Sequence, residues 1–129
     1  MSAPGSSVGL MITRFAPHYG DTTCASAVRA GDHLYLAHHA GALDDPTLAG
    51  QTRASLESLR TTLVRAGADM SALVQVTMWV REMGPEMREA WDVFAEFCGE
   101  EPPARMTATT DFFDARCLVQ IDGVAYLGT

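Results

Sequence analysis

The segment Thr52–Val80, TRASLESLRTTLVRAGADMSALVQVTMWV, decides the fold class because its hydrophobic period changes part-way along. From Val74 to Val80, apolar side chains occupy every second position, which is typical of a strand with one buried face. The part before Gly67 follows a helical period instead, with one face formed by Thr52, Leu56, Leu59, Leu63 and Ala66. A helix followed directly by such a strand predicts a domain that combines helices with a sheet.

The rest of the chain adds strands on both sides of this segment and a second helix. The predicted strands cover residues 11–15, 25–28, 33–37, 105–111 and 117–127, and the second helix begins at Gly84-Pro85 and ends at Gly99. Residues 41–50, with Asp44, Asp45 and Pro46, predict a loop. The order is βββαβαββ, which indicates an α+β domain with a mixed sheet, a hairpin at each end and both helices on one face.

Length and charge limit the function classes. The 129 residues fit one domain, which we place at 11–129 after a flexible tail at 1–10. Nine arginines and no lysine stand against sixteen acidic residues, and the net charge of −7 argues against a nucleic-acid partner. Apolar runs are far shorter than the about 20 residues of a membrane helix, so no membrane partner is expected.

The cysteines and histidines do not follow the spacing of metal sites. Cys24, Cys98 and Cys117 are odd in number and lack CxxC spacing, so we expect neither disulfides nor zinc, and a reducing cytoplasmic location. His38 and His39 are adjacent in a strand, so their side chains point to opposite faces and cannot bind one metal ion together. We expect no metal and no cofactor.

The face of the sheet away from the helices is predicted to be covered in an assembly. Trp79 and Tyr35 fall at alternation positions that place them on this second face. Large aromatic side chains on an uncovered sheet face favour burial by other subunits.

Arg105 and Asp122 are the first candidates for chemistry. Arg105 opens a strand, and its planar guanidinium can bind a carboxylate through two hydrogen bonds. Asp122 interrupts an apolar strand, where a carboxylate is costly unless it is paired or functional. A plain ion pair between the two residues across neighbouring strands is the structural alternative.

Two further candidates are a histidine and a thiol. Either His38 or His39 could act as an acid or base in a cleft, whereas His18 and His33 are interpreted as loop or surface residues. Cys24 lies in a polar stretch and could be a nucleophile if a base or positive charge lies nearby. Its structural alternative is a small, half-buried side chain.

Several stretches together resemble the YjgF/RidA family of imine and enamine deaminases. They span nearly the whole chain, in the family's order: SAVRAGDHLYL (26–36), QTRASLESL (51–59), AGAD (66–69), LVQVTMWV (73–80), PAR (103–105) and LVQID (118–122). The resemblance implies a chorismate mutase-like fold and a homotrimer with a cleft at each subunit interface. It also implies hydrolysis of an imine or enamine to a 2-oxo acid and ammonia, with Arg105 binding the substrate carboxylate and Asp122 placed near the attacking water.

Other cleft positions depart from the family pattern. Cys24 stands where deaminating members have Tyr, and Ala37, His38 and His39 stand where they have Ser-Gly-Gln. Trp91 replaces an Asn, and Thr107 replaces a residue that is often Cys. The added bulk of His38 and Trp91 indicates a ligand larger than a small imino acid.

Three functions therefore stay open. The first is imine or enamine hydrolysis by Arg105, Asp122, His38 and Cys24, with Trp91, His39, Thr107 and Ala37 lining the substrate site. The second is a specialised pathway enzyme of the same fold that acts on a larger imine, enamine or oxo acid, including by cyclisation or condensation. The third is a trimer that binds a metabolite without turning it over. Ribonuclease activity, which is sometimes attached to this family, is disfavoured by the net charge of −7.

Overall fold

The computed structural model describes residues 11–128, so the predicted tail at 1–10 lies outside the described residues. Six strands and two α-helices follow one another in the predicted order βββαβαββ. In chain order the elements are β1 (Ile12–Phe15), β2 (Ala27–Ala30), β3 (His33–His39), α2 (Leu48–Arg65), a short 3-10 turn (Met70–Ala72), β4 (Leu73–Val80), α3 (Met87–Cys98), β5 (Ala104–Thr109) and β6 (Val119–Tyr126).

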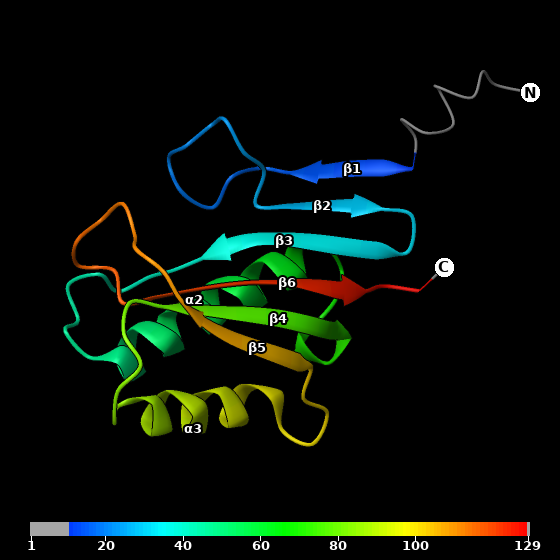
Figure 1. Ribbon diagram of the computed structural model, residues 1–129. Coiled ribbons are helices and arrows are strands. Elements are labelled where there is room, and N and C mark those ends of the chain that lie inside the picture. The colour runs from blue at the N-terminus through cyan, green and yellow to red at the C-terminus, as the bar shows by residue number, and fades with distance from the viewer. Residues whose placement is uncertain (1–10, 129) are drawn as a thin grey trace, which may run out of the picture.

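The strands form one mixed sheet in the order β1-β2-β3-β6-β4-β5, in which only β4 and β5 are parallel. Both helices lie on one side of the sheet (Figure 1), so the predicted α+β architecture is confirmed. The predicted hairpin at the C-terminal end is wrong, because β6 pairs with β3 and β4 and not with β5. The β4-α3-β5 crossover places β5 at the outer edge of β4, which leaves the inner edge of β4 for β6.

Helix α2 begins earlier than its hydrophobic period indicates, within the predicted loop 41–50. Thr47 caps the helix by accepting a hydrogen bond from the Gly50 backbone N–H at 3.1 Å. Asp45 orients this cap, because its carboxylate accepts from the Thr47 N–H at 2.8 Å and from the Thr47 hydroxyl at 2.6 Å. This capping chemistry starts the helix at Leu48, four residues before Thr52, the first residue of the predicted stripe, and Leu48 is itself buried in the core.

The core lies between the helices and the covered face of the sheet. Most of the predicted helix stripe is buried, with Ala66 partly buried at its end, and the predicted inward residues of β6 are buried. On β4 the prediction holds for Val76, Met78 and Val80 but is wrong for Val74, which is 47% exposed, because the pairing of β4 with β6 is irregular between Leu73 and Gln75 and Leu73 is buried instead. The fully buried core residues include Leu34, Leu56, Leu59, Leu63, Val76, Met78, Val80, Val119 and Ile121. Helix α3 adds Ala90, Val93 and Phe94 to this core, and it ends at Gly99, whose φ of 57° favours glycine.

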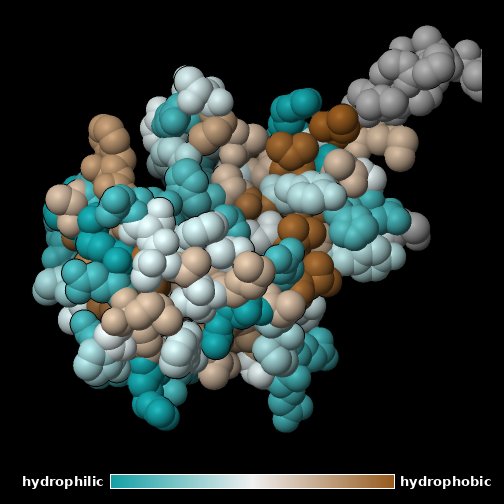
Figure 2. Space-filling view, viewed as in Figure 1, coloured by the Kyte–Doolittle hydropathy of each residue, from teal (hydrophilic) through white to brown (hydrophobic). Residues whose placement is uncertain are grey.

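The other face of the sheet, the open face, carries aromatic residues. Tyr35 is 51% exposed there, and Trp79 is half-buried beside Asp122. Figure 2 shows hydrophobic surface between polar side chains over the strands on this side. Within residues 11–128, neither α2 nor α3 has the length and apolar character needed to cross a membrane.

Candidate functional site

A β-bulge at the end of β3 decides which histidine faces outward. Leu36 pairs with Gly123 of β6 and His39 pairs with Ile121, so three residue steps on β3 oppose two on β6. The extra residue shifts the alternation by one position. As a result His39 is fully buried on the helix side, whereas His38 is exposed.

His39 is a core residue with both ring nitrogens bonded. Its Nδ1 donates to the Ala37 carbonyl oxygen at 2.6 Å, and its Nε2 then accepts from the Thr62 hydroxyl at 2.8 Å. Burial lowers the pKa of His39 to about 4. The expected substrate-binding role of His39 is therefore wrong for this chain, and Ala37 contributes a backbone carbonyl that fixes the buried ring.

His18 lies in the β1–β2 loop, which agrees with its interpretation as a loop or surface residue, but it is half-buried because it packs against His39. The two imidazole rings are stacked, with centroids 3.8 Å apart and planes within 3° of parallel. The His18 Nδ1 atom is buried without a hydrogen-bond partner, and burial lowers the pKa of His18. Tyr19 meets the His18 ring edge-on at 4.6 Å. These contacts seat the β1–β2 loop on the end of β3.

Tyr19, which sequence reasoning missed, links the two predicted residues Cys24 and His38. The Tyr19 hydroxyl and the Cys24 Sγ are 2.8 Å apart, and the Tyr19 ring stacks on His38 with centroids 5.8 Å apart. The hydrogen bond with Cys24 raises the pKa of Tyr19 to about 12. The only sequence signal for Tyr19 is an aromatic residue between Pro17 and Gly20 in an otherwise polar loop.

A cavity of about 320 Å³ opens beside this cluster. It lies where the β1–β2 loop, the end of β3, helix α2 and the start of β6 meet, and its lining residues are His18, Tyr19, His38, Ala40, Gly41, Leu43, Ser58 and Gln120. Gln120 is thus the β6 side chain that reaches the cavity. We call this site the imidazole cavity.

Asp122 lies outside the imidazole cavity, two residues beyond Gln120 on β6. It pairs with Thr77 of β4, and its Oδ2 accepts a hydrogen bond from Trp79 Nε1 at 3.0 Å on the open face. The alternative of an Arg105–Asp122 ion pair across neighbouring strands is wrong, since β4 separates β5 from β6. The expectation that Asp122 adjoins the site is not met within one chain.

Arg105 lies at the opposite edge of the sheet with two aromatic rings. It pairs with Val76, so its side chain is on the helix side, where its guanidinium carbon is 5.4 Å from the Trp91 ring centroid and 5.2 Å from that of Phe94. None of the ion pairs within residues 11–128 involves Arg105. Thr107, two residues further along β5, shares this face. The structure thus brings Arg105 and Trp91 together, and it places Thr107 on the same face of β5.

Arg105 and His38 cannot hold one small molecule within a single chain. From β5 to β3 the sheet order passes through β4 and β6, which gives three strand spacings, or about 14 Å. The Arg105 side chain also lies on the helix side of the sheet, whereas the His38 side chain is exposed at the bulge near the end of β3. Across residues 11–128, no three His, Cys, Asp or Glu side chains gather in a way that could hold a metal ion.

A family model described as endoribonuclease L-PSP matches residues 22–127. The chain belongs to this family, known also as YjgF/RidA. A RutC family protein from Pyrococcus horikoshii is 27% identical over 108 residues, which cover 79% of this chain and 85% of that protein. A YjgF family protein from Streptococcus pyogenes is 25% identical and superimposes with a TM-score of 0.80, covering 90% of this chain and 96% of that structure. A member of the YjgF/YER057c/UK114 family from Mycobacterium tuberculosis has the same fold, with a TM-score of 0.81 at 24% identity over 89% of this chain and 98% of that structure.

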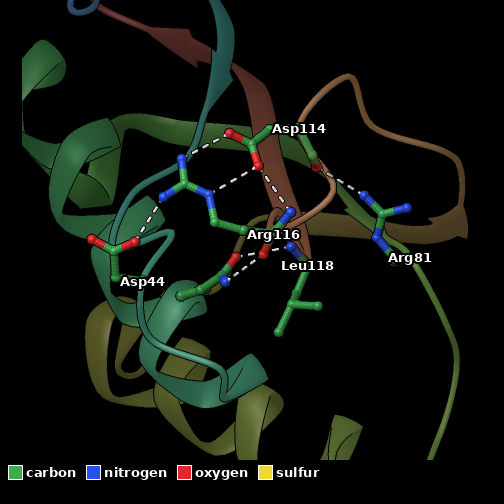
Figure 3. Close-up of polar contacts among 6 residues, drawn as sticks. Asp44, Arg81, Asp114, Arg116 and Leu118 are labelled. Atoms are coloured by element: carbon green, nitrogen blue, oxygen red, sulfur yellow. Dashed lines mark hydrogen bonds and ion pairs between the residues drawn. The ribbon is translucent and has the colours of Figure 1, made fainter.

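In this YjgF/RidA family chain, the β5–β6 loop lies at one end of the sheet (Figure 1). Ion pairs and hydrogen bonds connect this loop to the β3–α2 loop and to Arg81 at the end of β4. Arg116 lies between Asp44 and Asp114 (Figure 3), with ion-pair distances of 2.7 Å and 2.9 Å. The Arg116 side chain lowers the pKa of Asp114 to about 2. Arg81 donates to the Asp114 backbone carbonyl at 2.9 Å, also drawn in Figure 3. The loop next to the start of β6, and hence next to Gln120, is therefore held from both sides.

A buried glutamine completes this bracing. Gln51 is 1% exposed, and its Nε2 donates to the carbonyl oxygens of Asp45 and Arg116, each at 2.9 Å. Its Oε1 accepts from the Leu118 N–H at 2.8 Å. One side chain of α2 therefore ties the β3–α2 loop to the start of β6, between which the imidazole cavity opens.

Proposed function

We propose that this protein binds a carboxylate-bearing small molecule between two copies of the chain and hydrolyses an imine or enamine to a 2-oxo acid and ammonia. The observation that carries the proposal is Arg105, an exposed guanidinium beside Trp91 and Phe94 that takes part in no ion pair within residues 11–128. A planar fork of donors with an apolar flank suits the carboxylate of an amino-acid-derived substrate.

The proposal needs a second copy, because Arg105 and the imidazole cavity lie apart within one chain. A second chain that supplies Tyr19, His38 and Gln120 would complete the site around a ligand bound to Arg105. The open face with Tyr35 and Trp79 offers a surface on which copies can associate. The family resemblance supports a homotrimer with one such cleft at each interface.

The chemistry asked of these groups is modest. Water adds to the imine carbon, the nitrogen takes a proton, and the carbon–nitrogen bond of the adduct breaks to release ammonia and leave the 2-oxo acid. An exposed imidazole such as His38 can accept the proton of the attacking water and pass a proton to the leaving nitrogen. We assign the hydrogen bond to the attacking water to Gln120 and not to Asp122, because Gln120 is the β6 residue that lines the cavity. Arg105 holds the substrate in position for the attack.

The test follows the decay of freshly generated imines. An amino-acid oxidase or dehydratase supplies 2-iminopropanoate or 2-iminobutanoate, and ammonia release is compared between wild type and Arg105→Ala. We expect the protein-dependent rate of ammonia release to be at least about tenfold lower in the variant, because a charge-assisted hydrogen bond to the carboxylate is removed. The matched control is Arg88→Ala, which removes an exposed arginine of α3 and should keep wild-type rates. Equal rates for Arg105→Ala and wild type on every imine would refute the proposal.

Two further variants test the groups at the cavity. His38→Ala should slow proton transfer and so reduce turnover more than substrate binding. Cys24→Ser keeps a hydrogen-bonding group near the Tyr19 hydroxyl, so it separates a positioning role of Cys24 from a nucleophilic one. Turnover that survives Cys24→Ser but not His38→Ala supports hydrolysis without a covalent intermediate.

A further inference from the structure

The shape and chemistry of the imidazole cavity define the part of the substrate that Arg105 does not bind. Its wall contains three rings, those of His18, Tyr19 and His38, together with the aliphatic side chain of Leu43. None of the lining residues, all within the described part of the chain, is acidic or an arginine. Such a wall favours an uncharged, apolar and planar group.

The rings of this wall are fixed in place before any ligand binds. His18 is stacked on His39, which is itself hydrogen-bonded at both nitrogens and fully buried. Tyr19 contacts the rings of both His18 and His38, and its hydroxyl is hydrogen-bonded with Cys24. A preorganised aromatic wall binds a flat ring without the entropic cost of ordering side chains.

The cavity is also large for a short aliphatic substrate. A volume of about 320 Å³ lies within the range of cavities that enclose drug-sized ligands, and a two- or three-carbon side chain would leave most of it to water. Since no arginine of residues 11–128 lines the cavity, we assign the substrate carboxylate to Arg105 of a second copy.

We propose that the substrate of this site is an imine or enamine whose side chain carries an aromatic ring, with the ring held in the imidazole cavity and the carboxylate on Arg105 of another copy. This inference rests on the proposed function and narrows its substrate class. It gives Tyr19 and His38 a role in specificity in addition to the proton-transfer role of His38.

The test compares the binding of two stable product analogues, phenylpyruvate and 2-oxobutanoate, by isothermal titration calorimetry. Both carry the same 2-oxo acid group, and only the first has a ring. We expect phenylpyruvate to bind wild type at least about tenfold more tightly, because burial of a phenyl ring adds apolar contact. Tyr19→Ala should abolish this preference, whereas Tyr19→Phe, which keeps the ring and loses the hydroxyl, should keep most of it.

A matched control is Phe113→Ala, which removes an aromatic ring that is fully exposed on the β5–β6 loop and lies outside the cavity lining. Equal affinity for the two acids, with both lost in Arg105→Ala, would overturn the aromatic substrate class and leave the proposed function standing. If Tyr19→Ala weakens the binding of phenylpyruvate but Arg105→Ala does not, the ring binds in the imidazole cavity but the carboxylate does not bind Arg105. That result would refute the proposed function. A preference that persists in Tyr19→Ala would overturn the placement of the ring.

Discussion

Acidification should destabilise this protein through His39. His39 is fully buried, donates to Ala37, accepts from Thr62 and is stacked on His18. Burial, and to a lesser degree the neighbouring His18, lower its pKa from 6.5 to about 4. The folded protein therefore excludes a proton that the unfolded chain accepts readily.

The sign and size follow from this difference. Above about pH 6.5 the ring is neutral in both states and its contribution to stability is complete; as the pH falls from 6.5 to about 4, only the unfolded chain gains the proton, so stability is lost. The difference of about 2.5 pKa units, at about 1.4 kcal/mol per unit, gives about 3.5 kcal/mol when the pH has fallen below both pKa values. The lowered pKa of His18 acts in the same direction. Asp114, whose pKa is lowered by Arg116, loses its contribution only below 3.8, outside this window.

Guanidinium unfolding at fixed protein concentration, measured between about pH 7 and pH 4.5, checks this prediction. Wild type should lose about 2–3 kcal/mol of unfolding free energy across this range. His39→Gln should be less stable at neutral pH, because a buried polar pair is disturbed, but should show a flatter pH dependence. His33→Gln, at an exposed position of β3, is the control and should follow wild type. A His39→Gln profile as steep as that of wild type would refute the reasoning.

Three other predictions concern stability and are checked by thermal or urea unfolding. Gln51→Ala should cost about 3 kcal/mol, because two carbonyls and one N–H lose a buried partner, whereas Gln75→Ala at an exposed site should cost little. Gly123→Ala should cost about 1–3 kcal/mol, since a Cβ there would lie 2.6 Å from the Gln75 backbone oxygen; a neutral result would contradict the close packing of β4 and β6. Arg81→Ala should cost about 2 kcal/mol because its guanidinium satisfies two loop carbonyls. Arg116→Ala should cost less than Arg81→Ala, because its ion pairs are exposed to solvent. Equal losses in the two arginine variants would count against this distinction.

The fold class could be predicted because local signals agree with the tertiary arrangement. The change of period at Gly67 separates a helix from a strand, and Gly99 ends the second helix as its position indicates. The start of α2 was harder to predict, because it depends on the cap formed by Thr47 and Asp45 and not on the spacing of apolar residues. Arg105 was identified from its residue type and place in the sequence.

The candidate site was predicted only in part, because its members meet through contacts between segments distant in sequence. Cys24 and His38 were named from the sequence, but Tyr19, which joins them, was not, because its one local signal, an aromatic side chain in a loop, does not show what it contacts. Gln120 and Asp122 lie on the same face of β6, and only the packing of the neighbouring loops brings Gln120 to the cavity and leaves Asp122 beside Trp79.

The order of the elements, most of the core positions and the aromatic character of the open face follow from side-chain periodicity and capping residues within short segments, so they can be predicted without the fold. The tertiary structure alone decided that β6 enters between β3 and β4 and that His39, not His38, points inward. Strict alternation from Leu34 and Leu36 would have buried His38. The bulge against β6 reverses that order, because backbone pairing between strands about 80 residues apart fixes the register and no local pattern records it.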